Sequence, residues 1–334
     1  MPEISWLLVV IIFAALAFDY TNGAHDAANA IATVVSTKVL SPRAAVVMSA
    51  TLNFGGAMLG TRVAETIGKG IVDPKMILDS HCLLLASVLA AIAWNSFTWW
   101  LGLPSSSSHA LIGGLIGAAV VECGWSVLQY RSILEKVVVP LFVSPLAGLI
   151  AGYFLMVLIA WLTHGLRYRT ASAAFKRLQI LTAGFMSVSH GSNDAQKTMG
   201  LITLSLLSYG LIPSLTVPLW VKLACAGAIS LGTMTGGWKI IRTMGHKIFR
   251  MRPVHGFAAE IAASTVIFSA SLFGAPISTT HVISSSVLGV GSAQRWTAVK
   301  WRVAGEMVSA WVFTIPCAAV AGALWMMLLG AIGL

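Results

Sequence analysis

Residues 20–30 read YTNGAHDAANA, and residues 188–198 read VSHGSNDAQKT. The two stretches carry a glycine, an aspartate and an alanine at matching places. A second pair follows in the same order, GLPSSSSH at 102–109 and GAPISTTH at 274–281. Two pairs of motifs in one order indicate an internal duplication. Polar motifs repeated inside apolar segments are typical of carriers built from two halves.

The composition around these motifs is that of a membrane protein. Hydrophobic residues make up 57% of the 334-residue chain and charged residues only 10%, and the mean hydropathy is +0.86. So few charges cannot give a folded chain of this size a solvated surface. We therefore predict an all-α, polytopic protein in the lipid bilayer, with about 10–12 transmembrane or half-membrane helices, some of them broken or re-entrant.

The basic residues predict the orientation of the helices. Loops 165–177 and 239–252 contain several Arg and Lys and no acid, whereas loop 62–79 mixes both signs. The positive-inside rule places the first two loops in the cytoplasm and the third outside. Apolar segments then alternate five to each half, so both termini lie outside and the second half is inverted. We expect a first repeat at 1–164, a cytoplasmic linker at 165–177 and a second repeat at 178–334.

The net charge of +10 raises the question of a nucleic-acid partner. The basic residues lie in short loops between apolar runs, where they act as topology signals, so no nucleic-acid partner is expected. No long hydrophilic insert separates the two halves, which is typical of a prokaryotic carrier in the plasma membrane.

Two apolar segments, 4–37 and 178–208, exceed the roughly 20 residues of a straight span. Each contains a Gly-Asp motif, so we expect a broken helix, a tilted helix or two half-helices. Pro104 and Pro276 precede the two Ser/Thr runs, as proline does in the first turn of a helix. Irregular backbone at membrane depth is tolerated only inside the protein, so both motif pairs are expected to line one central cavity.

The Ser/Thr runs offer an anion site. Each places several hydroxyls at the start of a helix, where free N–H groups and the helix dipole attract anions. A lone run of this kind would more simply bond back to a helix carbonyl. Two runs at matching repeat positions, each after a proline and before a histidine, favour a site for a tetrahedral oxyanion.

The two aspartates suit the opposite charge. Asp26 and Asp194 lie in apolar stretches, where a charge costs roughly 2.5–3.5 kcal/mol on insertion scales, so a functional role is the first hypothesis. Carboxylate and amide oxygens bind hard cations or protons. A structural ion pair with Lys197, one helical turn after Asp194, is the alternative. The amide residues beside the aspartates are Asn22, Asn29 and Asn193.

Histidines and one glutamate complete the candidates. His109 and His281 end the two Ser/Thr runs, and either a helix–helix hydrogen bond or a cavity role fits them. Glu260 lies in an apolar run, which favours a coupling or gating role. The additional candidates for coupling are His25, His109, His190, His281 and Glu260.

Four motifs carry a resemblance to a known family. NGAHDAANAIATVV, HGSNDAQKTMGLITL, GLPSSSSHALIGGLIGA and GAPISTTHVISSSVLGVG resemble the inorganic phosphate transporter (PiT) family. The resemblance implies a secondary transporter that moves phosphate with a cation, with no catalysis, no cofactor and no resident metal. It assigns phosphate to Ser105, Ser106, Ser107, Ser108, Ser278, Thr279 and Thr280. It assigns the cation to Asn22, Asp26, Asn193 and Asp194.

Details of the motifs point to one branch of that family. His25 stands where many members have Asn, and the second motif contains Gln196 and Lys197. This pattern resembles the bacterial low-affinity branch, which takes up metal–phosphate complexes with protons. Lys197 beside the aspartates would replace a bound cation, so we expect proton coupling rather than sodium coupling. The phosphate is carried free or with a divalent metal.

Other functions stay open or are disfavoured at this point. A sodium-coupled phosphate symporter and a sulfate permease fit the same scaffold, and a monomer and a homodimer fit equally. An intramembrane serine hydrolase is disfavoured, because adjacent Ser108 and His109 do not face each other on a helix. The chain also lacks a Gly-x-Ser-x-Gly nucleophile motif.

Overall fold

A computed structural model describes residues 5–68 and 80–333 as a bundle of helices. Most of the loop predicted to lie outside, residues 69–79, falls beyond the described residues. The helices are α1 (Trp6–Ser36), α2 (Pro42–Ala57), α3 (Arg62–Gly68), α5 (His81–Leu101), α6 (Ser107–Cys123), α7 (Tyr130–Ile133), α8 (Val139–Leu162), α9 (Tyr168–Ser208), α10 (Leu219–Thr235), α11 (Trp238–Arg242), α12 (Pro253–Leu272), α13 (Thr279–Gln294) and α14 (Trp301–Ala331). Short 3-10 and π segments link some of them. The all-α, polytopic fold is confirmed.

The helices are long enough to cross a bilayer. Within the described ranges five spans pass by length and composition, and a sixth passes if α10 and the segment 238–247, bent by 61° to each other, count as one. Large apolar side chains of the outer helices are exposed, among them Phe142 and Phe154 on α8 and Phe313 on α14. An apolar surface of this kind is suited to lipid rather than to water.

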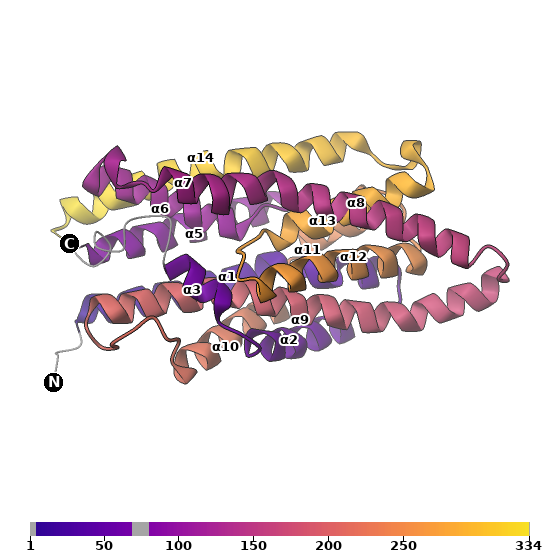
Figure 1. Ribbon diagram of the computed structural model, residues 1–334, viewed down its shortest axis with the longest axis horizontal. Helices are drawn as coiled ribbons and strands as arrows, with labels where there is room; N and C mark the ends of the chain where they lie inside the picture. Colours follow the sequence, from indigo (N-terminus) through magenta and orange to yellow (C-terminus); the bar gives the residue numbers. More distant parts are fainter. Residues whose placement is uncertain (1–4, 69–79, 334) are drawn as a thin grey trace.

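The two motif helices, α1 and α9, run in opposite directions. Both termini lie at one end of the bundle, and the turn between α8 and α9 lies at the other end (Figure 1). Helices α1 and α9, which carry the paired Gly-Asp motifs, are therefore antiparallel. This antiparallel arrangement is what an inverted repeat requires, and the bounds of the two repeats stay a prediction. The basic loops α1–α2, α8–α9 and α13–α14 all lie at the end opposite the termini.

The two long segments are single helices. α1 runs unbroken for 31 residues and α9 for 41 residues, about 60 Å. The broken helix and the half-helices predicted for 4–37 and 178–208 are therefore wrong. Residues 168–177 also belong to α9, so the expected linker is a loop only up to Arg167. The reason is that polar motif side chains find partners on neighbouring helices, so the backbone need not unwind to satisfy them.

The motif glycines allow those neighbours to approach. A Cβ at Gly23 would overlap the carbonyl of Ile229 on α10, and one at Gly191 would overlap the carbonyl of Asn53 on α2. Each motif helix thus packs on the second helix of the other repeat. α8 packs on α13 and α14 on α6 in the same exchanged manner. The two repeats are consequently interlocked around a shared core.

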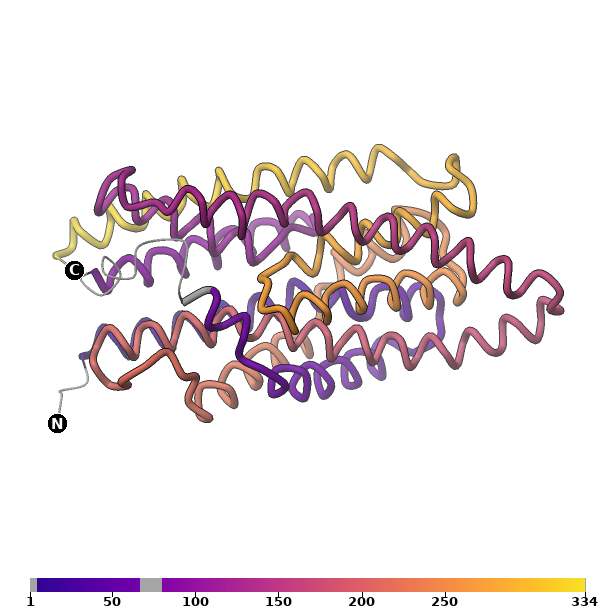
Figure 2. The backbone as a smooth tube through the Cα atoms, viewed as in Figure 1, coloured from indigo at the N-terminus to yellow at the C-terminus, as the bar shows by residue number. Residues whose placement is uncertain are grey.

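Two helical hairpins enter the bundle from opposite ends. α5 and α6 start and finish at the terminus end, whereas α12 and α13 start and finish at the other end, and each pair turns near the middle (Figure 2). Gly102 and Gly274 sit in the turns with positive φ values of 71° and 70°, which glycine adopts without strain. Ser106 and Ser278 then cap α6 and α13. The Ser/Thr runs therefore begin helices, as predicted.

Candidate functional site

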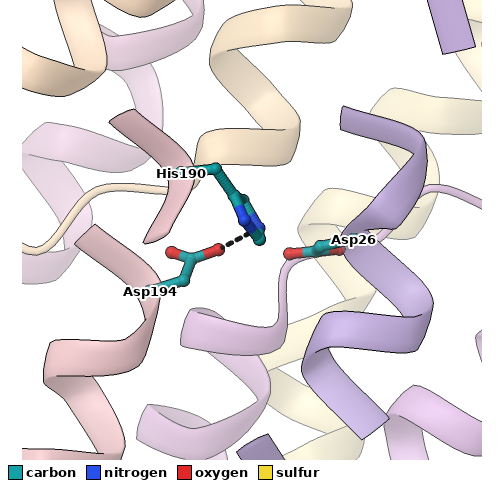
Figure 3. Close-up of side chains that lie close together, drawn as sticks. All are labelled: Asp26, His190 and Asp194. Carbon is teal, nitrogen blue, oxygen red and sulfur yellow. Dashed lines mark ion pairs between the residues drawn. The ribbon is translucent and has the colours of Figure 1, made fainter. Parts of the chain in front are cut away.

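The site lies where the two motif helices and the two hairpin tips meet. Antiparallel α1 and α9 bring Asp26, His190 and Asp194 together (Figure 3), with one ligand atom from each within 4.8 Å of the others. All three side chains are buried. The two Gly-Asp motifs therefore meet at one buried place, while the central cavity expected there stays a prediction.

Asp26 is held between its own helix and the second hairpin. Its Oδ1 atom lies 2.7 Å from Nδ1 of His25 and accepts a 3.2 Å hydrogen bond from the hydroxyl of Thr280. The amide of Asn29 donates to Thr280 at 3.0 Å and to Thr279 at 3.3 Å. The motif of the first repeat therefore binds the hairpin tip of the second repeat.

Asp194 has three partners. The Thr279 hydroxyl donates to its Oδ2 at 2.9 Å, and Nε2 of His190 lies 2.9 Å from the same oxygen. The Lys197 ammonium pairs with Oδ1. His190 is oriented by Asn53 of α2, whose Oδ1 lies 3.2 Å from its Nδ1. This carboxylate is thus bound by α9 and by the tip of α12–α13.

Lys197 joins the two hairpin tips. Its ammonium donates to the Ser108 hydroxyl at the start of α6 and to the Ile277 carbonyl, 3.3 Å away, before α13. The side chain is 1% exposed. A buried ammonium is stable only when it is paired and hydrogen-bonded, and here the carboxylate of Asp194, a hydroxyl and a carbonyl supply those partners. Lys197 therefore places a buried ammonium beside Asp194 and between the two hairpin tips.

The remaining predicted hydroxyls divide into two groups. Ser105 bonds to Thr98 at 2.8 Å and lies 3.3 Å from Nε2 of His25, while Ser107 is buried without a hydrogen-bond partner among the described residues. Ser106 and Ser278 instead accept from backbone N–H groups of their own helices, at 3.2 and 3.3 Å. Those two hydroxyls serve as helix caps, whereas Ser105, Ser108, Thr279 and Thr280 contact residues of the Gly-Asp motifs.

The paired histidines pack against each other. The rings of His109 and His281 lie 5.0 Å apart between the hairpins, and His281 stacks on Trp311 of α14 at 4.3 Å. Neither ring nitrogen of His281 has a hydrogen-bond partner within the described part of the chain. The pair therefore joins the two hairpins by ring contact, and the helix–helix hydrogen bond considered for His281 is not formed.

Glu260 lies in a separate polar cluster. Its carboxylate accepts hydrogen bonds from Thr33 of α1 and from Thr182 of α9, with Gln179 at 3.5 Å. Thr33 is seven residues beyond Asp26, about 10 Å along α1. The structure therefore keeps Glu260 apart from the aspartates, on the side opposite the termini.

Two predicted amides also lie at the edge of the site. Asn193 donates to Ser271 at 3.0 Å and to the Ala275 carbonyl at 3.3 Å, which fixes the turn before α13. Asn22 is buried, and neither atom of its amide has a partner among the residues described. Neither residue contacts the phosphate-assigned hydroxyls directly.

The sequence interpretation missed several residues of the site region. Thr98 bonds to His25 and Ser105, and Asn53 orients His190. Both come from stretches outside the repeated motifs, so no pattern in the sequence points to them. Asp19 did have one. It lies seven residues before Asp26 and hence on the same face of α1.

Comparisons with known proteins show which family and which solved fold the chain resembles. Residues 22–322 match the model of the "Phosphate transporter family". The chain is 47% identical over 319 residues to a "Probable low-affinity inorganic phosphate transporter" of Bacillus subtilis, covering 95% of this chain and 96% of that one. A protein of the same description from Rhizobium meliloti is 45% identical, covering 95% of each. A solved structure described as "The sodium-dependent phosphate transporter" has a TM-score of 0.89 and 26% identity, covering 98% of this chain and all of that one.

Proposed function

The chain belongs to the phosphate transporter family, and from this premise we propose that it is a secondary active transporter that imports inorganic phosphate with protons. The family resemblance predicted from the four motifs is confirmed, and the protein is a transporter rather than an enzyme. The coupling ion, the direction, the plasma-membrane location in a prokaryote and the outside position of the termini are part of the proposal.

One observation carries the proposal. Hydroxyls of both hairpin tips bond directly to the charged residues of both motifs, through the contacts of Thr279 with Asp194, Thr280 with Asp26 and Ser108 with Lys197. A phosphate between the tips would accept hydrogen bonds from hydroxyls and from Lys197. Protonated phosphate would donate to a carboxylate, which sulfate at neutral pH cannot do. This favours phosphate over sulfate.

The charges of the site require a positive partner for the anion. Asp26 and Asp194 carry two negative charges and Lys197 carries one positive charge. Two like charges about 4 Å apart repel by about 4 kcal/mol at an effective dielectric constant of 20. An anion therefore binds readily only after a positive charge has entered. His25 and His190 contact the two aspartates, and imidazole takes up protons near neutral pH.

Lys197 favours protons over sodium. Its ammonium pairs with Asp194 and donates hydrogen bonds to Ser108 and to the carbonyl of Ile277. A sodium ion at the same place would therefore be repelled by a fixed positive charge. The donor atoms of Asp26, His190 and Asp194 would instead face the metal if phosphate arrives as its neutral metal complex. Such a complex is the second form of substrate that we propose.

Sodium coupling is the second candidate, because the similar solved structure is described as sodium-dependent. Purified protein in proteoliposomes separates the candidates. Radiolabelled phosphate uptake is measured with a pH gradient alone, with a sodium gradient alone and with neither, and labelled sulfate is measured in parallel. Accumulation driven by the pH gradient is expected. Accumulation that needs sodium, or that carries sulfate equally well, would contradict the proposal.

We expect Thr279→Ala to weaken phosphate binding. Hydrogen bonds to charged groups contribute about 1.5–3 kcal/mol, so the apparent affinity in uptake assays should fall roughly 10- to 100-fold. Thr279→Ser keeps the hydroxyl and should stay near wild type. Ser106→Ala removes a helix cap that contributes about 1 kcal/mol. It should lower the melting temperature and leave the affinity for phosphate close to wild type. Equal affinity losses in Thr279→Ala and Ser106→Ala would contradict the assignment of the two hydroxyls.

A further inference from the structure

Asp19 is a buried carboxylate that the phosphate site does not use. It lies on α1 seven residues before Asp26, about 10 Å toward the terminus end of the bundle. Its side chain is 0% exposed, and neither carboxylate oxygen has a hydrogen-bond partner among the described residues. Buried carboxylates are normally hydrogen-bonded or paired. We therefore expect Asp19 to bind a positively charged ligand.

Its polar neighbours also have side-chain atoms without a hydrogen-bond partner among the described residues. Asn22, one turn along α1, has both amide atoms free of hydrogen bonds within the described part of the chain, and so has the hydroxyl of Thr198 on α9. The carboxylate of Asp19 lies beside Thr198 and beside the thiol of Cys225 on α10. The charged groups that face it are Asp194 and Lys197 of α9, and Lys197 is already bound to Asp194.

These residues belong to one stripe along α1. Residues 19, 22, 26, 29 and 33 recur at alternating steps of three and four, which places them on one helix face, and all five are polar and buried. Thr33 at the far end of the stripe bonds to Glu260. The central site thus lies between two buried carboxylates, Asp19 on the terminus side and Glu260 on the other.

The side chains of Asp19, Asn22 and Thr198 suit a proton better than a metal cation. The Asp19 carboxylate has a hydroxyl and a thiol beside it but no paired cation among the described residues, so at membrane depth it is unstable as an anion and binds positive charge. Hard metal cations need about six oxygen ligands, whereas Asp19, Asn22 and Thr198 offer few, and a thiol is a poor ligand for them. A proton needs a single oxygen. Thr198 can accept and donate a proton, and it lies one turn from Asp194 on α9.

We propose that Asp19, flanked by Asn22 and Thr198, is a proton-binding station on the terminus side of the phosphate site. A proton from that side forms an O–H bond on the carboxylate of Asp19. The bond breaks when the proton passes by way of the Thr198 hydroxyl toward Asp194, and no oxidation or reduction takes place. This inference rests on the proposed proton-coupled function and adds to it the place where the proton is first held.

Two assays on Asp19→Asn test the station. Phosphate exchange, with labelled phosphate on one side and unlabelled phosphate on the other and no pH gradient, needs the phosphate site but no net proton movement. It should stay near wild type. Accumulation driven by a pH gradient should fall about tenfold or more, because asparagine cannot carry a proton. Asp19→Glu, which restores the carboxyl, should recover most of the accumulation.

The other outcomes decide against the station. Full pH-driven accumulation in Asp19→Asn would overturn it. Equal loss of exchange and accumulation in a folded variant would place Asp19 in the phosphate site instead. If Asp19→Asn lost sodium-driven accumulation of phosphate but kept proton-driven accumulation, the ligand of Asp19 would be sodium. That result would overturn the assignment of a proton. Wild-type protein that accumulates no phosphate under a pH gradient would contradict the proposed function itself, before any variant is compared.

A second variant covers the case in which Asp19→Asn does not fold. Thr198→Val keeps the carboxyl and removes the hydroxyl between Asp19 and Asp194. It should shift the pH dependence of accumulation while phosphate exchange is kept. A pH profile that matches wild type in Thr198→Val would overturn the proposed path of the proton.

Discussion

Asp194→Asn is expected to abolish the concentrative uptake of phosphate, by about 100-fold or more. The change keeps the shape of the side chain but removes the charge that pairs with Lys197 and accepts from Thr279. It leaves a buried ammonium without its counter-ion, and breaking a buried pair of this kind costs about 3–5 kcal/mol. Uptake of labelled phosphate into proteoliposomes under a pH gradient is the measurement.

Glu306→Gln is the matched control for Asp194→Asn. It also removes one negative charge, but from a half-exposed carboxylate 3.7 Å from Arg302. Exposed pairs contribute at most about 1 kcal/mol, so uptake should stay close to wild type. Asp26→Asn should behave like Asp194→Asn, because Asp26 occupies the equivalent position in the first repeat. Coupled uptake retained in Asp194→Asn would remove that carboxylate from the transport site.

Lys197→Met is expected to have the largest effect on stability. Methionine matches the length of the lysine stem but leaves Asp194 buried beside Ser108 without a cation. The free energy of unfolding should fall by about 3–5 kcal/mol, and uptake should be lost. Thermal unfolding in detergent gives the stability. Lys176→Met, at an exposed position on the same helix, removes one charge with little expected change.

The double variant Asp194→Asn/Lys197→Met makes the pairing testable. Removing both partners avoids an isolated buried charge, so the double variant should be more stable than Lys197→Met alone. Stabilities that simply add would show that the two side chains do not act as a pair. Lys197 would then not be the fixed cation that the preference for protons requires.

Much of the site could be predicted because the duplication doubled each signal. The Gly-Asp motifs and the Pro-Ser/Thr runs each occur twice, so chance matches were easy to reject. The structure brings Asp26, Asp194, Lys197, Thr279 and Thr280 into contact. Ser106 and Ser278 were indistinguishable from their neighbours in sequence, because capping depends on where the helix begins. Glu260 stands out in the sequence because it lies in an apolar run. Its hydrogen-bond partners on α1 and α9 are known only from the structure.

The prediction of a broken helix is wrong for the two motif segments, 4–37 and 178–208. Segment length and a polar motif together indicate that a span must be interrupted, since unpaired backbone groups are costly in lipid. In α1 and α9 the backbone stays fully helical, and the irregular backbone lies instead in the hairpin turns at Gly102 and Gly274. Sequence length does not reveal how far a helix extends beyond the bilayer.

The sequence alone determined the membrane class, because hydropathy is a local property, and it predicted the duplication and the two kinds of ligand from the chemistry of the repeated residues. Charge placement predicted the inverted order, since that prediction depends only on which loops carry Arg and Lys. The tertiary structure decided which hydroxyl meets which carboxylate, that Lys197 joins both hairpins, and that Asp19 is buried with no cation paired to it among the described residues. Those contacts join residues from different helices, and their separation in space is fixed only when the two inverted halves interlock.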